Sequence, residues 1–189
     1  AYWLTALGGG GAAEAQVLLK NMNARPSLRR ITGNPFLLRL AAEIYADKRE
    51  IAGSRADLYE RWINVLWERA CRRGAPIDKK ESAWGQLEEI AWSLQMQQPL
   101  PKQCDVDLLR GKLGVLACVD GRYYTFIHLT LREYFVAQRL RRAWRKNQLE
   151  TWRFLMPRLH RPEWREPLLL MIGAAQPGGR RRPRRRRSP

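Results

Sequence analysis

The sequence has few cysteines and few histidines. Its three cysteines, Cys71, Cys104 and Cys118, are far apart and form no Cys-x-x-Cys pair. Zinc sites and disulfide frameworks depend on such pairs or on an even set of cysteines, so we predict neither, and we expect a reducing, cytoplasmic location. The two histidines, His128 and His160, accompany no Ser/His/Asp set and no metal-ligand cluster. We therefore predict no catalytic residue and no metal-binding residue.

Long apolar runs are also missing. A helix that crosses a bilayer needs ~20 consecutive apolar residues, and the runs in this chain are only one or two helical turns long. The chain starts Ala1-Tyr-Trp-Leu, with no basic segment ahead of an apolar one, so no signal peptide is predicted. We expect no membrane partner. Because the sequence starts without methionine, we also expect it to be a piece of a longer protein.

Acidic residues are scarce relative to basic ones. The 189 residues include 35 Lys and Arg against 18 Asp and Glu, a net charge of +17. Seven of the arginines lie between Arg180 and Arg187, and without them the net charge is +10. Hydrophobic residues make up 45% of the chain, which is typical of a globular protein with one domain or two small ones. Global disorder, a collagen-like chain and a disulfide-rich miniprotein are therefore excluded.

Helical patterns occupy most of the chain as far as Gly114. Asn34-Pro35 is a typical helix start, because Asn caps well and Pro suits the first helical position. Ser54 begins a second capping sequence. Apolar residues recur at spacings of three and four between these signals. We predict helices over about 12–22, 27–31, 35–45, 55–73, 80–97 and 106–113.

The periodicity changes after Gly114. Residues 115–119 and 123–127 are β-rich, and Asp120-Gly121 between them is a typical hairpin turn, because a type I′ turn needs two residues with positive φ. Thr130-Leu-Arg-Glu133 predicts a capping box at the start of a helix that reaches about Lys146. The predicted buried face of that helix consists of Leu131, Tyr134, Phe135 and Leu140.

This order of elements (helix, helix, short helix, hairpin, helix) is typical of a winged-helix domain. We predict a mainly α protein with a helical subdomain at 1–53 and a winged-helix domain at 54–147 that has one β-hairpin wing. Amphipathic helices at about 152–159 and 164–174 form a pair over 148–175, which would start HEAT-like helical repeats. Residues 176–189 are mostly Pro, Gly and Arg, and we predict that this tail is disordered.

Three segments resemble, in their order and spacing, the C-terminal half of a NACHT-type NTPase module. They are Thr32–Tyr45, which contains Gly-Asn-Pro, Arg55–Trp62, and Tyr124–Ala137, which contains Phe-Ile-His. Such modules belong to the STAND class of signalling NTPases, which includes the NOD-like receptors. The resemblance covers roughly residues 27–140. It implies that the chain is the regulatory part, a nucleotide-sensing lock, of an ATP/ADP-dependent switch in defence or signal transduction.

The resemblance also implies nucleotide-binding residues. Pro35, with Gly33, would pack on the adenine ring, and His128 would contact the β-phosphate of ADP in the closed state. An imidazole N–H can donate to phosphate, and the following helix N-terminus favours an anion. A structural alternative stays open for each residue. Pro35 could only start a core helix, without contacting a nucleotide. His128 could only make a local hydrogen bond.

The catalytic elements of this family are missing. A phosphate loop needs Gly-x-x-x-x-Gly-Lys-Ser/Thr, and the first lysine after Gly8–Gly11 is Lys20. We interpret this glycine run as a connector, and we predict that the chain alone is not an enzyme. The resemblance implies that ADP or ATP, with Mg²⁺, is bound mainly by an upstream phosphate-loop domain of a parent NTPase. It also implies downstream sensor repeats and homo-oligomer formation on activation.

A second hypothesis stays open, in which the chain is a basic winged-helix module that binds nucleic acid. The net charge, the wing and the Arg-rich tail favour it, and such binding would be electrostatic and sensitive to salt. The predicted recognition helix, Val106–Leu113, offers mainly Arg110 and Lys112.

Overall fold

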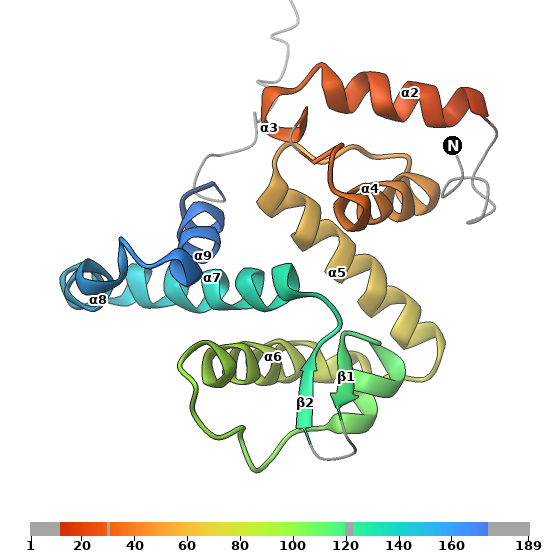
Figure 1. Ribbon diagram of the computed structural model, residues 1–189. Helices are drawn as coiled ribbons and strands as arrows, with labels where there is room; N and C mark the ends of the chain where they lie inside the picture. Colours follow the sequence, from red (N-terminus) through yellow and green to blue (C-terminus); the bar gives the residue numbers. More distant parts are fainter. Residues whose placement is uncertain (1–11, 30, 120–122, 174–189) are drawn as a thin grey trace, which may run out of the picture.

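The computed structural model describes residues 12–29, 31–119 and 123–173 (Figure 1). Within these ranges the chain is mainly helical and has one small antiparallel sheet, as predicted. The α-helices are α2 (Ala12–Asn23), α3 (Pro26–Arg29), α4 (Pro35–Lys48), α5 (Arg55–Arg72), α6 (Lys80–Gln95), α7 (Leu129–Lys146), α8 (Gln148–Leu155) and α9 (Pro162–Gly173). The other elements are η1 (Ile77–Lys79), η2 (Asp107–Lys112), η3 (Met156–Arg158), β1 (Leu116–Val119) and β2 (Tyr123–Phe126). No helix of the described ranges is long and apolar enough to cross a membrane.

Helix α5 connects the two ends of the described structure. It packs against α4 on one side and contacts α7 and α9 on the other (Figure 1). Helices α2 and α3 lie beyond α4, while α6 and the hairpin lie at the opposite end. Helix α7 lies between α6 and α9 and contacts both. The core therefore continues from α4 through α5 and α7 to α6.

Capping side chains explain where α4 and α5 begin. The Asn34 side chain accepts a hydrogen bond from the Leu37 N–H at 3.1 Å, and Pro35 occupies the first turn. The Ser54 hydroxyl accepts from the Asp57 N–H at 3.1 Å. Both predicted helix starts are confirmed.

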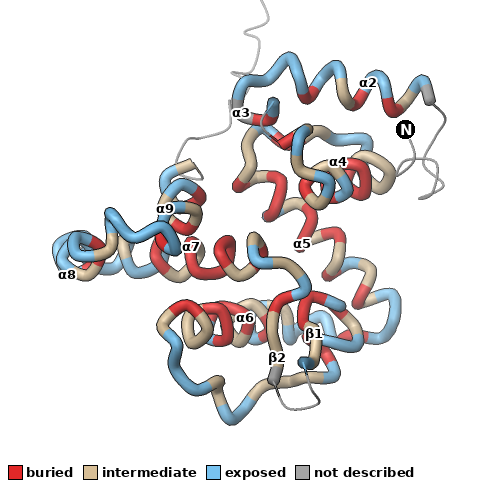
Figure 2. Tube along the Cα trace, viewed as in Figure 1, coloured by how far each residue is buried: buried red, intermediate tan, exposed pale blue. Residues whose placement is uncertain are grey.

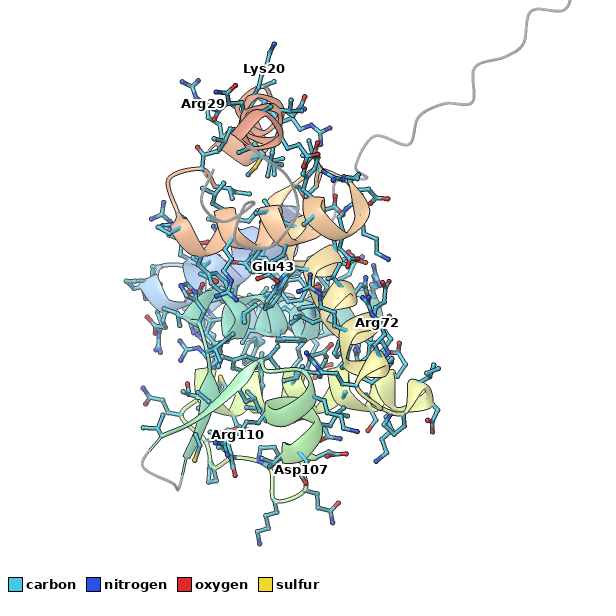
Figure 3. All side chains as sticks on the ribbon, turned by 90° about the vertical axis from the view of Figure 1, so that its right-hand side faces the viewer. Lys20, Arg29, Glu43, Arg72, Asp107 and Arg110 are labelled. Atoms are coloured by element: carbon cyan, nitrogen blue, oxygen red, sulfur yellow. The ribbon has the colours of Figure 1, made fainter. Side chains whose placement is uncertain are left out.

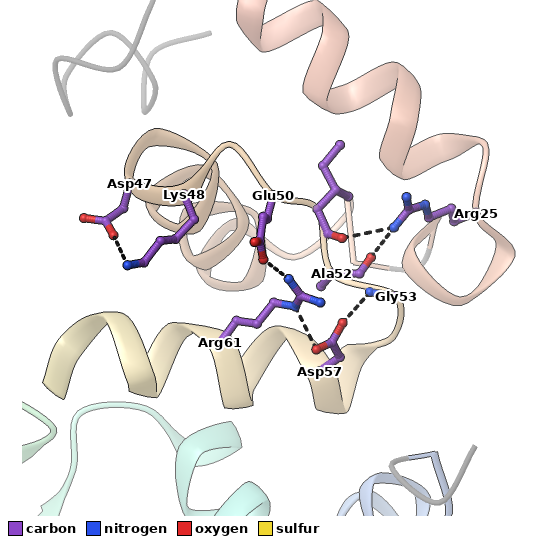
Figure 4. A network of polar contacts seen from close by, with 9 residues as sticks. Arg25, Asp47, Lys48, Glu50, Ala52, Gly53, Asp57 and Arg61 are labelled. Carbon is purple, nitrogen blue, oxygen red and sulfur yellow. Dashed lines mark hydrogen bonds and ion pairs between the residues drawn. The ribbon is translucent and has the colours of Figure 1, made fainter. Parts of the chain in front are cut away.

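Polar contacts hold the linker between α4 and α5 (Figure 4). Arg25 donates to the carbonyl oxygens of Ile51 and Ala52, at 3.1 and 2.7 Å. Asp57 accepts from the Gly53 N–H at 2.6 Å and pairs with Arg61 at 2.8 Å. The linker is therefore fixed both from the turn between α2 and α3 and from α5.

The hairpin pairs Leu116 with Phe126 and Val119 with Tyr123. The buried Phe126 ring packs on Phe135 of α7, with 5.6 Å between centroids, and this contact attaches the hairpin to the helix core. The predicted Asp120-Gly121 turn lies outside the described residues, as do Gly8–Gly11 and the predicted tail at 176–189. The predicted domain boundaries after residues 53 and 147 fall between helices, and the division into domains stays a prediction.

The capping-box prediction at Thr130 is wrong. Helix α7 begins at Leu129 and its N-cap is His128, whose backbone is extended (φ −149°, ψ 137°). The His128 imidazole accepts from the Thr130 N–H at 3.3 Å and therefore occupies the position that a threonine cap would take. Glu133 is buried at 8% exposure. The predicted buried face of this helix is confirmed.

The short helix before the hairpin is a π-helix, which the prediction missed. The Leu113 N–H bonds to the Leu108 carbonyl, five residues back, and Gly114 then has φ +68°. The wide turn places both Leu108 and Leu109 in the core. The last two predicted helices also begin earlier than expected, at Gln148 and Pro162.

Glu43 is a buried carboxylate that joins α4 to α5 (Figure 3). It accepts from the Trp62 indole N–H at 2.9 Å, from Arg39 at 2.8 Å and from Arg69 at 3.3 Å. Its side chain is only 4% exposed, so this charge depends on all three donors.

We expect Glu43→Ala to destabilise the protein, because it leaves the buried Trp62 N–H without an acceptor, at a cost of about 1–3 kcal/mol. Chemical denaturation of the full chain measures this loss. The matched control is Glu68→Ala, which removes a carboxylate that is 47% exposed from its pair with Lys48. An exposed pair contributes at most about 1 kcal/mol. Equal losses in the two variants would contradict the structural role of Glu43.

Candidate nucleotide-contact site

The ring of Phe36 lies flat on the ring of His128. The two centroids are 4.0 Å apart and the planes differ by 1°. Phe36 follows Pro35 in the first turn of α4, and His128 caps α7. The Trp62 ring of α5 packs edge-on against the Phe36 ring, with 6.2 Å between the two centroids. The structure therefore brings residues of all three motif segments to one place.

The residues predicted to contact a nucleotide lie at the surface of this junction. Gly33 and Pro35 are exposed at the start of α4, and His128 is half-buried. A Cβ atom added at Gly33 would meet no heavy atom within 4 Å, so that side of the loop is open. Pro35 is next in sequence to the residue that stacks on His128. Both predicted contact points therefore border one surface.

The hydrogen bond from the Thr130 N–H favours one tautomer of His128. Its Nδ1 atom accepts from the Thr130 N–H and lies 2.9 Å from the Thr130 hydroxyl. A nitrogen that accepts carries no proton, so the neutral ring carries its proton on Nε2. No described residue bonds to Nε2. Partial burial lowers the pKa of His128, which favours this neutral form at neutral pH. The site therefore presents an N–H donor beside the N-terminus of an 18-residue helix.

A buried polar cluster lies behind this donor. Arg55 pairs with Glu166 of α9 at 2.6 Å, and the hydroxyl of fully buried Tyr59 has no hydrogen-bond partner among the described residues. Burial raises the pKa of the Tyr59 phenol, and the neighbouring Thr130 and Arg55 side chains oppose that rise. Burial also raises the pKa of Glu133, helped by the charge of Glu166 and opposed by Arg55. The polar groups of α5, α7 and α9 thus meet directly beneath the α7 N-terminus.

Sequence reasoning missed two residues of this site. It assigned Phe36 to a core helix face, and the nearby proline was the only signal that this aromatic ring belongs to the junction. It assigned Thr130 the role of N-cap, whereas Thr130 orients the imidazole that performs this role. The contact between Phe36 and His128 does not follow from sequence spacing, since 92 positions separate these residues.

The segment predicted as a DNA-recognition helix offers little basic surface. Leu108 and Leu109 of η2 are buried, and Lys112 donates to the Gly74 carbonyl. Arg110 is exposed at the end of the molecule opposite α2 (Figure 3). One exposed cation on a π-helix of six residues does not favour major-groove binding.

Comparisons of the chain with protein-family models, with curated proteins and with solved structures find no match. In the described ranges, no three His, Cys, Asp or Glu side chains gather in a way that would hold a metal ion.

We expect NMR to show His128 with its proton on Nε2 and with a pKa below the usual 6.5 of histidine. Burial disfavours the charged ring, so Phe36→Ala, which uncovers one face, raises this pKa toward its ordinary value. His160→Gln assigns the signals, because His160 is the only other histidine. A proton on Nδ1, or a pKa that Phe36→Ala leaves unchanged, would contradict the described cap and stack.

Glu133 gives a stability test with a defined pH dependence. Because its pKa is raised in the folded protein, its ionisation costs stability above that pKa. We expect Glu133→Gln to raise the free energy of unfolding at neutral pH, by more than the ~0.5 kcal/mol scatter of surface substitutions. This gain in the free energy of unfolding shrinks as the pH falls through the pKa that Glu133 has in the folded protein. It disappears below the pKa that Glu133 has in the unfolded chain. The control, Glu60→Gln on the exposed side of α5, should show no such trend.

Proposed function

We propose that this chain is the regulatory part of a NACHT-type ATP/ADP-dependent signalling switch, in which ADP bridges α4 and α7. The observation that carries the proposal is the Phe36–His128 stack, since it brings the Gly-Asn-Pro segment and the Phe-Ile-His segment to one surface. The order α5, α6, η2, hairpin and α7 supports our assignment of residues 54–147 to a winged helix.

The geometry suits an adenine nucleotide. Pro35 offers an exposed, rigid ring on which a flat base can pack. The Nε2–H of His128 offers a donor for a phosphate oxygen, and the positive end of the α7 dipole lies beside it. Thr130 keeps the ring in this tautomer without using Nε2. The base and the phosphates would then be bound by different helices.

ADP bound between α4 and α7 would act as a switch because it would favour one arrangement of these helices. A ligand shifts a two-state equilibrium only by its difference in affinity between the states. A hydrogen bond to a charged group contributes about 1.5–3 kcal/mol, or roughly a 10- to 150-fold bias. We propose that ADP favours the arrangement with α4 on α7, and that exchange for ATP releases it. Mg²⁺ and most of the nucleotide affinity would come from an upstream phosphate-loop domain.

The proposal predicts which variants lose ADP contact. In NMR titrations of the labelled full chain, we expect ADP to shift the signals of His128 and Phe36, and His128→Ala to weaken this binding about tenfold or more. Pro35→Ala should weaken binding of ADP but not of pyrophosphate, because only ADP carries a base. His160→Ala is the matched control and should bind like the original chain.

Pyrophosphate also distinguishes binding at this site from binding to the arginines between Arg180 and Arg187, which attract any polyanion. If ADP and pyrophosphate shift the same signals, and if those signals exclude Phe36 and His128, the proposal is wrong. In the intact parent protein, His128→Ala should weaken ADP retention and raise basal signalling. Unchanged retention and signalling would contradict the proposed role of His128.

A further inference from the structure

A large groove lies at the C-terminal end of α7, far along the helix from His128. Helices α7, α8 and α9, with Leu159 after η3, line a volume of about 630 Å³, within the range of ligand-binding pockets. Its walls are mainly apolar and include Trp152, Leu159 and Ile172. Arg141 and Arg145 also line it. The groove therefore combines an apolar floor with positive charge.

The apolar surface extends beyond the groove itself. Six of the eleven large apolar side chains that are exposed in the described ranges lie between Leu149 and Ile172. Leu149 and Trp152 are three residues apart and share a face of α8, and Met156, four residues further on, begins η3. Trp152 is 45% exposed and Ile172 is 64% exposed. Figure 2 shows α8 mostly exposed at one end of α7. Such a concentration of apolar surface marks an interaction site.

The net charge around this surface is positive. Residues 139–173 contain nine Lys and Arg and three Glu. Arg145 makes no ion pair or hydrogen bond with any residue that the structure describes, and Arg141 bonds only to the amide oxygen of Gln138, at 3.1 Å. Electrostatic complementarity therefore favours a partner that carries carboxylates.

The segments of this chain outside the described ranges do not fit this requirement. Residues 1–11 and 174–189 contain no Asp or Glu, and the second segment adds seven arginines. A second copy of the chain would bring the same positive rim against itself across a two-fold interface. A small anionic amphiphile would fill the groove but would leave Leu149, Met156 and Leu169 uncovered, since these lie outside its lining. A longer amphipathic occupant covers both parts.

We propose that the groove binds an acidic amphipathic helix that lies outside these 189 residues. Its apolar residues, at positions i, i+3, i+4 and i+7, would cover Trp152, Leu159 and Ile172, as in other helix-in-groove complexes. Its flanking carboxylates would reach Arg141 and Arg145. This binding surface is separate from the proposed nucleotide contact and does not depend on it.

The test uses three labelled peptides of about 18 residues, or five helical turns. The first has leucines on one helical face and glutamates beside them. The second has the same composition in scrambled order, and the third has lysine in place of glutamate. Fluorescence anisotropy with the full chain, at about 0.15 M salt, measures their affinities. The Arg-rich segment attracts the first two peptides equally, so a difference between them reports the groove.

We expect the first peptide to bind at least tenfold more tightly than the other two. Arg145→Glu should weaken it tenfold or more, whereas Arg110→Glu, which changes the net charge equally on η2, should change it less than twofold. Ile172→Ser should weaken binding as well, and Ile77→Ser, at a 78% exposed site on η1, is its control. Neither isoleucine is buried, so loss of folding does not explain a loss of binding.

Three outcomes would overturn the proposal. One is equal binding of the ordered and scrambled peptides, or equal effects of Arg145→Glu and Arg110→Glu. Another is a dimer in sedimentation that Ile172→Ser dissociates, which would assign the surface to a second copy of the chain. The third is Arg145-dependent binding of laurate without binding of the first peptide, which would assign the groove to a small amphiphile.

Discussion

The contact between Phe36 and His128 is the interaction on which the candidate site depends. The stack covers the imidazole and disfavours its charged form, while Thr130 places the proton of the neutral ring on Nε2. Both effects produce a neutral donor. A protonated ring would lose the acceptor at Nδ1, and with it a helix cap of about 1 kcal/mol. A phosphate near Nε2 acts in the opposite direction, because an anion favours the charged ring. A neutral donor can contact a phosphate without loss of the cap, so the cap and the proposed ligand contact are compatible.

Helix α5 connects this site to both ends of the protein through two unequal polar contacts. Glu43 attaches α4 to α5, is 4% exposed and is bonded by three donors. Arg55 attaches α9 to α5 through Glu166, and both of these side chains are about one-third exposed. Solvent screens the second contact more strongly than the first. Any rearrangement of the helices would therefore break the contact to α9 more easily than the contact to α4. The α9 side is also where the charged and unpartnered groups around Tyr59 and Glu133 gather.

Local signals in the sequence predicted the helix starts well, because a cap is made by residues that are neighbours in the chain. Asn34 and Ser54 are examples. The errors arose where distant packing decides local structure. Residues Asp107–Lys112 form a π-helix with Leu108 and Leu109 in the core, and no local signal in the sequence distinguishes this wide turn from an α-helix. His128 became the cap because α4 supplies a ring that holds it in place. The predicted contact residues Pro35 and His128 border one junction, but only the structure could show that Phe36 joins them. The exposed face of α8 was equally inaccessible, since an amphipathic pattern predicts an apolar face but not whether this face is covered.

Helix α7 carries both proposed binding surfaces, one at each end. Its 18 residues separate them by about 27 Å. The helix dipole places partial positive charge at His128, where a phosphate would bind, and partial negative charge near Arg145 and Lys146, which stabilise that end. The arginines of the groove therefore have a structural role as well, but the dipole offsets only about half of one elementary charge. Several basic side chains remain in excess around the apolar face. An acidic partner would neutralise that excess and would hold α7, α8 and α9 together, whereas a nucleotide would hold α7 against α4. The two ligands thus act on opposite ends of one rigid helix and do not compete for any residue.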